Sequence, residues 1–134
     1  MNYDKGNVIE KRGIIFKDDF TPDPKGKHPA MIAIAVTEDN QHMYFLTLTS
    51  QTDKYFARPD MKDRYFLLKK TAYNMLKKTS LVNLQNIYKE PVSNEIPVAF
   101  VQPDEYKKLI RKFRDWQEAA DMPDEYYEEL KGLL

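Results

Sequence analysis

The sequence contains no cysteine among its 134 residues. It therefore forms neither disulfide bonds nor metal sites with thiolate ligands. Only four residues are glycine, and none of them belongs to a glycine-rich loop that cradles phosphate groups. No apolar run approaches the ~18 residues that a membrane-spanning helix needs, and residues 1–13 lack the apolar stretch of a secretory signal. These absences predict a cytoplasmic protein that does not associate with membranes.

The sequence also lacks a net charge, because 21 Lys and Arg residues balance 21 Asp and Glu residues. This balance argues against a protein that coats nucleic acids nonspecifically. The charges are nevertheless separated along the chain. Residues 54–80 carry eight basic and two acidic residues, whereas residues 115–134 carry seven acidic residues and one lysine. We expect the middle of the chain to meet an anion, although most charge runs are simply solvated faces.

The residues that are present indicate one small folded domain over residues 1–134. Hydrophobic residues make up 42% and charged residues 31% of the chain, an ordinary globular balance. Six short segments have the residue types of β-strands, being apolar throughout or rich in β-branched and aromatic residues. They are residues 13–16, 30–36, 42–49, 64–70, 80–88 and 96–101.

Turn-forming residues at 38–41 predict that the second and third strands make a hairpin. Residues 71–79 fit either a helical turn or a bent strand. Pro97 places the last strand at an edge or a bulge, because proline cannot donate to a strand ladder. Since strands spaced this closely leave no room for helical crossovers, we expect a small, strongly bent antiparallel sheet or barrel.

The hydrophobic period changes after the last predicted strand. Pro103 suits the first turn of a helix, and acidic residues follow it where they complement the helix dipole. The apolar side chains that recur at helical spacing are Tyr106, Leu109, Ile110, Phe113 and Trp116. We interpret Trp116 as a core anchor. We also expect a last short helix that begins near Pro123 and has Tyr127 and Leu130 on its inner side.

Five pieces of the sequence, in this order and at this spacing, resemble the MazF/PemK family of toxins. They are the opening strand at 12–16, the loop end at 26–29 before the strand 30–36, the strand end at 48–51, the segment 80–87, and the helix from Pro103. The resemblance covers about residues 12–116. It implies a mainly β fold with C-terminal helices, a small SH3-like antiparallel β-barrel of the CcdB/MazF type. Residues 120–134 extend beyond the helix that closes typical members, and we expect them to form a C-terminal helical extension.

The resemblance also implies a function. Members of the family are toxins of toxin–antitoxin systems that cleave single-stranded RNA without a metal or other cofactor. The resemblance implies two protein partners, a second copy in a homodimer and a cognate antitoxin. The catalytic arginine of the family falls at His28 in this sequence, and the family's threonine is retained as Thr49.

RNA cleavage without a metal needs a base for the 2′-hydroxyl, an acid for the leaving oxygen and donors for the phosphate oxygens. A histidine side chain ordinarily titrates near neutrality, so His28 can be the base or the acid, while Thr49 can donate a hydrogen bond through its hydroxyl. Because the 2′-hydroxyl is the only nucleophile in evidence, we expect a 2′,3′-cyclic phosphate product. The residues expected to bind RNA are Lys27, Tyr44, Ser50, Gln51, Lys54 and Arg58, which supply charge, hydrogen bonds or a stacking surface.

Structural interpretations of the same residues stay open. His28 also fits a solvated loop histidine, Thr49 fits a strand end because of its β propensity, and Arg58 fits a surface loop. His42 lies beside the predicted turn, and we interpret it as structural. Its neighbours offer no second ligand at metal spacing, so no metal site is assigned.

Three functions therefore remain open from the sequence. The first is an endoribonuclease toxin. The second is a catalytically weak or inactive barrel of the same family that binds RNA or protein. The third is an unrelated interaction module with an SH3-like barrel, since a fold does not determine a function. The acidic extension adds a subsidiary hypothesis, that it covers the basic middle of the chain, against the alternative that it packs on the core through Tyr127 and Leu130.

Overall fold

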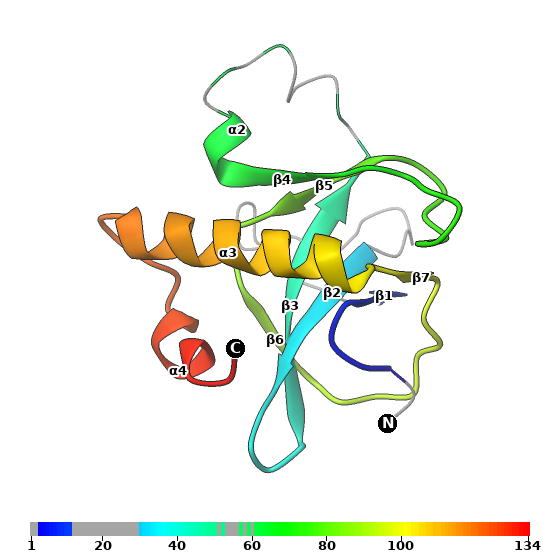
Figure 1. The fold of residues 1–134 in the computed structure, drawn as a ribbon. Helices are drawn as coiled ribbons and strands as arrows, with labels where there is room; N and C mark the ends of the chain where they lie inside the picture. Colours follow the sequence, from blue (N-terminus) through cyan, green and yellow to red (C-terminus); the bar gives the residue numbers. More distant parts are fainter. Residues whose placement is uncertain (1–2, 12–29, 51, 53–56, 58, 60) are drawn as a thin grey trace.

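The structure, a computed structural model, describes residues 3–11, 30–50, 52, 57, 59 and 61–134 (Figure 1). Within this part of the chain, one sheet of seven strands is accompanied by three helices. The strands are β1 (Asn7–Glu10), β2 (Ala30–Val36), β3 (His42–Thr49), β4 (Tyr65–Leu68), β5 (Ser80–Asn83), β6 (Tyr88–Pro91) and β7 (Ala99–Phe100). The helices are α2 (Met61–Arg64), α3 (Pro103–Ala119) and α4 (Tyr127–Lys131).

The strand β3 lies at the centre of the sheet. The strand order is β4-β5-β3-β2-β1-β7, every pairing is antiparallel, and β6 pairs with β3 outside this path. The first half of β3 pairs with β6, whereas Leu48 and Thr49 pair with β5. The register between β2 and β3 shifts between Ala33 and Ala35, an irregularity that increases the local twist. One strand therefore has two successive partners along the same side.

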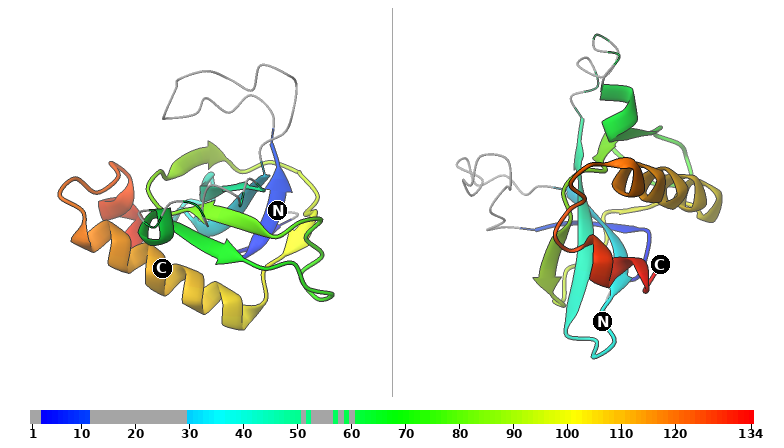
Figure 2. Two further views of the ribbon diagram at one scale, coloured as in Figure 1. Left: turned by 90° about the horizontal axis from the view of Figure 1, so that it is seen from above. Right: turned by 90° about the vertical axis from the view of Figure 1, so that its left-hand side faces the viewer.

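The connection between β4 and β5 brings the two ends of the sheet together. The amide of Phe100 in the edge strand β7 donates a hydrogen bond to the carbonyl of Asn74 at 2.8 Å. Nearby, Gln102 Nε2 donates to the carbonyl of Tyr73 at 3.0 Å. The sheet is thus curled into an antiparallel half-barrel (Figure 2). This confirms the expectation of a mainly β chain with a small, bent antiparallel sheet followed by helices.

The helices α3 and α4 cover the same face of the sheet (Figure 2). Alternate residues of β2 face opposite ways, as the pleat of a strand requires. Ile32 and Ile34 pack with Leu109 of α3 and Leu130 of α4 in one core cluster. On the other face, Met31 joins a smaller cluster that includes residues Tyr3 and Phe45. The helices therefore complete the larger of two cores.

The predictions for the strands have mixed outcomes. The strands predicted at 30–36 and 42–49 and their hairpin are confirmed as β2 and β3. The single strand predicted at 80–88 is wrong, because the side chain of Asn83 accepts a hydrogen bond from the amide of Gln85 at 2.8 Å. This local turn ends β5 and separates it from β6. The last strand is at an edge, as predicted, but β7 has only two residues.

Two further strand predictions concern the N-terminal part. The strand predicted at 13–16 lies outside the described residues. The strand β1 at residues 7–10 was not predicted, since it lies in a stretch that reads as polar apart from Val8 and Ile9. Both of these side chains are buried, at 1% and 0% exposure. Two apolar residues are too short a pattern to reveal a strand.

The long C-terminal helix is confirmed, with one correction to its buried face. Leu109 and Phe113 are fully buried, as predicted, but Trp116 is only half-buried against the core. The neighbouring Gln117 is fully buried instead. The short helix α4 begins at Tyr127, later than predicted, and Tyr127 and Leu130 are buried as expected. The extension at residues 120–134 therefore contributes side chains to the core.

Candidate functional site

The strand register gathers several chain segments at one end of the sheet. Ala30, the first residue of β2, pairs with Glu10 at the end of β1 and with Leu48 near the end of β3. Thr49, the last residue of β3, pairs with Leu81 near the start of β5. We name the end of the sheet marked by Ala30 and Thr49 the threonine end. Most of the predicted site residues lie next to these two positions in the sequence. They belong to residues 27–28, which precede Ala30, and to residues 50–58, which follow Thr49.

Only part of the predicted site can be placed. The candidates outside the described residues are Lys27, His28, Gln51, Lys54 and Arg58. Of the others, Thr49 is half-buried and Ser50 is exposed, and both lie at the threonine end. The carbonyl of Ser50 accepts a hydrogen bond from the amide of Thr52 at 2.9 Å. The predicted hydroxyl donor and one predicted RNA contact are therefore adjacent at the same end of the sheet.

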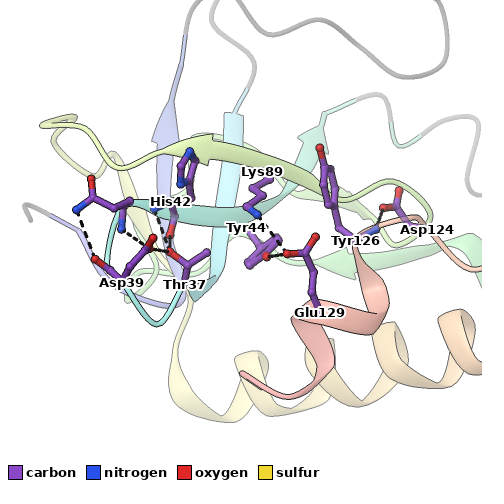
Figure 3. Close-up of polar contacts among 9 residues, drawn as sticks. Thr37, Asp39, His42, Tyr44, Lys89, Asp124, Tyr126 and Glu129 are labelled. Carbon is purple, nitrogen blue, oxygen red and sulfur yellow. Dashed lines mark hydrogen bonds and ion pairs between the residues drawn. The ribbon is translucent and has the colours of Figure 1, made fainter.

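Tyr44 has a different environment from the one its predicted role requires (Figure 3). Its side chain is 1% exposed, and its hydroxyl donates a hydrogen bond to Glu129 Oε2 of α4 at 2.6 Å. Lys89 Nζ lies 3.2 Å from the same carboxylate oxygen and 5.5 Å from the centre of the Tyr44 ring. Tyr126 packs edge-on against Tyr44 with 6.2 Å between ring centres. This is the position of a core residue covered by α4, which offers no ring face to an RNA base.

The contacts among Tyr44, Lys89 and Glu129 favour the ionised form of the Glu129 carboxyl group over its protonated form. The hydrogen bonds from Tyr44 and then from Lys89 lower the pKa of Glu129 below its ordinary value. Burial, followed by the hydrogen bond to Glu129, raises the pKa of Tyr44, and the bond to Glu129 also raises the pKa of Lys89. The cluster therefore holds α4 on β3 and β6 with a neutral phenol, a carboxylate and an ammonium group.

The same cluster bears on the role of the acidic extension. Glu129 pairs with Lys89, which lies outside the basic segment at 54–80. The side chain of Asp124 accepts a hydrogen bond from the amide of Ile87 at 3.0 Å. With Leu130 fully buried, these contacts favour the structural interpretation of the extension over the hypothesis that it covers the basic segment.

His42 is the first residue of β3 and lies beside the turn between β2 and β3, as predicted. Its amide donates to Thr37 Oγ1 at 3.1 Å, and this hydroxyl in turn donates to Asp39 at 2.6 Å (Figure 3). The hydrogen bond from Thr37 is the main cause of a lowered pKa at Asp39. Asn40 takes a left-handed conformation with φ of 60°, which asparagine tolerates in turns. His42 therefore lies at the opposite end of the hairpin from the threonine end.

Residues 69–79, which connect β4 to β5, form a loop that we name the lysine loop. Leu68 pairs with Ser80 at its base, so the loop leaves the sheet at the threonine end. A pair of exposed lysines lies at each side of the loop. These residues are Lys69, Lys70, Lys77 and Lys78.

A buried asparagine shapes this loop from within. Asn74 is fully buried, and its Oδ1 accepts hydrogen bonds from the amides of Thr71 and Leu76 at 3.1 and 3.2 Å. Its Nδ2 donates to the carbonyl of Lys69 at 2.8 Å. Its own carbonyl accepts the bond from Phe100 that joins the loop to β7. One side chain thus replaces the regular backbone pairing that the loop lacks.

The two neighbours of Asn74 point outward. Tyr73 is 79% exposed and Met75 is 62% exposed, although both are large and largely apolar. Met75 has a φ of 61°, in the left-handed region, which costs an ordinary residue about 1–2 kcal/mol. Strain of this kind persists only where the surrounding structure enforces it, and it is frequent at functional sites.

The lysines of this loop belong to the basic segment at 54–80, but none of them is among the predicted site residues. A more specific signal was present. No acidic residue occurs between Arg64 and Lys89, and the lysine pairs flank a tyrosine and a methionine. The outward direction of Tyr73 and Met75 depends on Asn74, and no hydrophobic pattern reveals it.

Two findings concern what the described residues do not form. They include no cluster of three or more histidine and acidic side chains that is able to hold a metal ion. Among them, no helix is long and apolar enough to cross a membrane.

No model of a known protein family matches the chain, and no curated protein sequence matches it. The function must therefore be argued from the residues.

Proposed function

We propose that this chain is an endoribonuclease that cleaves single-stranded RNA without a metal, acting as a toxin whose activity a cognate antitoxin restrains. The observation that carries the proposal is the register at the threonine end. Ala30 lies opposite Leu48, so the first residue of β2 and the last residues of β3 belong to the same end of the sheet. His28 precedes Ala30 by two residues in the sequence, and Thr49 follows Leu48. The curled antiparallel sheet is compatible with the SH3-like barrel that the resemblance to MazF/PemK toxins implies.

The proposed reaction uses the RNA itself as the nucleophile. His28 takes the proton of a 2′-hydroxyl, and the 2′-oxygen attacks the adjacent phosphorus atom. The bond between phosphorus and the 5′-oxygen breaks, and this oxygen takes a proton from water, while the protonated His28 returns its proton to the solvent. Thr49 donates its hydroxyl to a phosphate oxygen on which negative charge develops. The products are a 2′,3′-cyclic phosphate and a 5′-hydroxyl.

The direct test is cleavage of a single-stranded RNA by the purified chain in the presence of a chelator. We expect His28→Ala to reduce the rate about 10²–10⁴-fold, the range of general acid–base catalysis. His28→Arg should retain or raise the rate. The matched control is His42→Ala, because His42 is the only other histidine and lies at the far end of the β2–β3 hairpin. Equal rates for the two alanine variants contradict the assignment, and loss of cleavage in the chelator contradicts the mechanism.

Thr49 has its own matched control. Thr49→Val removes the hydroxyl and keeps the shape of the side chain, and we expect a lower rate with unchanged folding. Thr47→Val makes the same change two residues earlier on β3, at a side chain that is 9% exposed. The cyclic phosphate is identified by mass spectrometry of the cleaved RNA. A linear phosphate formed directly would show that water, and not the 2′-hydroxyl, is the nucleophile.

One observation favours the alternative of a barrel that binds RNA without cutting it. The lysine loop gathers exposed cations and an exposed tyrosine, features that serve RNA binding and need no catalytic group. A chain that binds single-stranded RNA but leaves it intact under all conditions would establish this alternative.

We also propose that the chain forms a homodimer, and a measurement of its molecular mass in solution tests this.

A further inference from the structure

We propose that the lysine loop is a binding platform for single-stranded RNA, on which a base stacks against Tyr73 while the lysines contact phosphates. This inference rests on the proposed function only in taking RNA as the ligand. It assigns residues that the cleavage mechanism does not use.

The first argument is the exposure of apolar side chains on a loop of fixed shape. Tyr73 is 79% and Met75 is 62% exposed, and Asn74 between them is fully buried. The side chain of Asn74 makes three hydrogen bonds to the backbone of its own loop. The backbone that carries the aromatic ring is therefore already ordered, so less conformational freedom is lost on binding, which favours affinity.

The second argument is charge. The sequence between Arg64 and Lys89 contains no acidic residue. None of the four loop lysines forms an ion pair with a carboxylate among the described residues. Lys70 Nζ donates to the carbonyl of Lys77 at 3.2 Å, which draws the two lysine pairs together across the loop. The loop therefore carries an exposed aromatic ring and four lysines without carboxylate partners in the described part of the chain.

The combination of these features decides the ligand. Lysine is depleted in protein–protein interfaces, whereas proteins that bind single strands combine cationic tracks with aromatic rings on which bases stack. Two side chains extend the exposed apolar surface along the edge of the sheet, Phe100 at 37% and Val98 at 39% exposure. A protein partner at this edge is the competing occupant, and the experiment separates the two.

The third argument is position. Leu68 and Ser80 pair at the base of the lysine loop, and the next residue, Leu81, pairs with Thr49. The base of the lysine loop therefore adjoins Thr49, the proposed phosphate contact at the threonine end. The lysine loop would then add RNA affinity to that supplied by the residues that contact the cleaved phosphate.

The experiment measures binding with cleavage suppressed. The probe is a 12-nucleotide single-stranded RNA of mixed sequence with a fluorescein label, and its anisotropy is followed as the His28→Ala protein is added. We expect Tyr73→Ala to raise the Kd about 5- to 150-fold, as for loss of one stacked base. Tyr73→Phe should restore affinity, because it keeps the ring. Met122→Ala is the control, since Met122 is 88% exposed and lies away from the loop.

Salt dependence tests the lysines separately. The double variant Lys69→Gln, Lys70→Gln should reduce the slope of log Kd against log salt by about 1.4, which corresponds to two lost contacts with single-stranded phosphates. The matched control is the double variant Lys107→Gln, Lys108→Gln, which removes an exposed lysine pair from α3. Equal slopes for the two double variants would overturn the assignment of the phosphate contacts.

Failure of this inference is distinguishable from failure of the proposed function. RNA cleavage with unchanged binding by Tyr73→Ala would overturn the inference alone. Binding that depends on Tyr73, in a parent chain that never cuts RNA, would support the inference and overturn the proposed function. If Tyr73→Ala leaves RNA affinity unchanged but lowers the mass of the protein in solution, the loop is a protein interface and the RNA platform is ruled out.

Discussion

In the sequence, the lysine loop and the C-terminal extension are both charge runs with tyrosines between the charges. The structure gives them opposite roles. The extension turns Tyr127 and Leu130 into the core, at 2% and 0% exposure, and its Glu129 pairs with Lys89. The lysine loop turns Tyr73 outward at 79% exposure. The difference lies in where the aromatic rings go, which the charge pattern does not determine.

Each of the two regions depends on one buried amide. Gln117 of α3 holds the start of the extension, because its Nε2 donates to the carbonyl of Leu84 at 2.7 Å and its Oε1 accepts from the amide of Asp124 at 2.8 Å. Asn74 holds the lysine loop in the same manner. In the extension the amide fixes a segment whose apolar side chains are buried, and in the loop it fixes a segment whose apolar side chains are exposed. A rigid exposed apolar segment indicates binding, whereas a rigid buried one indicates stability.

The largest expected effect concerns the extension. We expect Leu130→Ala to lower the free energy of unfolding by about 2–5 kcal/mol, because it leaves a cavity at a fully buried position. Urea unfolding measures this change. Met122→Ala, at an 88% exposed position of the same extension, should change stability by less than about 0.5 kcal/mol. A stable Leu130→Ala variant with higher RNA affinity would instead revive the hypothesis that the extension covers a basic surface.

The second prediction removes the amide that anchors the extension. Gln117→Met keeps the length of the side chain but leaves the buried backbone groups of its partners without their bonds, at a cost of about 1–3 kcal/mol. Gln41→Met changes the same residue type at an exposed turn position and should have little effect on urea unfolding. RNA affinity should be unchanged in both variants. Equal stability of the two variants would show that Gln117 does not hold the extension.

The elements with strong periodicity could be predicted from the sequence, and those that depend on single polar side chains could not. The runs that form β2 and β3 and the helical spacing of Leu109 and Phe113 are long enough to be unambiguous. The break between β5 and β6 depends on one turn at Asn83. The burial of Gln117 cannot be predicted from the pattern of apolar residues, because glutamine side chains are mostly exposed in folded proteins.

The candidate site shows the same limit. Thr49 and Ser50 lie together because strand register follows from the hydrophobic pattern of the hairpin. Tyr44 was expected to contact RNA, but its hydroxyl bonds to Glu129, which is 85 positions away in the sequence. A contact over this separation is a result of tertiary packing. For the same reason, the outward direction of Tyr73 could not be derived from the lysine run around it.

The third prediction separates stability from binding within the lysine loop. Met75→Gly removes the strain of a left-handed methionine, about 1–2 kcal/mol, against an entropic cost of about 0.5–1 kcal/mol for glycine. We expect stability to rise by up to about 1.5 kcal/mol while RNA affinity falls, since the exposed side chain is lost. Asn40→Gly is the control at a φ of 60°, where asparagine is already tolerated and the gain should be smaller. A Met75→Gly variant that binds RNA as tightly as the parent would show that the strain serves no binding role.

The smallest expected effect concerns stability as a function of pH. It depends on the Glu129 carboxylate, which joins α4 to the sheet through Tyr44 and Lys89. Hydrogen bonds from Tyr44 and Lys89 lower the pKa of Glu129 in the folded chain, whereas in the unfolded chain it has the ordinary value of about 4.3. The contribution of the carboxylate to stability is therefore complete above the unfolded pKa, and it is lost as the pH falls through the folded pKa. Glu129→Gln cannot titrate, so the difference in Tm between parent and variant should shrink as the pH is lowered from 6 to about 3. Glu128→Gln is the control, because Glu128 is 79% exposed and pairs only with its helix neighbour Lys131 among the contacts described, so this change should have little effect on Tm. A Tm difference for Glu129→Gln that stays constant over this range would mean that the carboxylate does not fasten the extension, and the contrast with the lysine loop would then depend on the buried Leu130 and Gln117 alone.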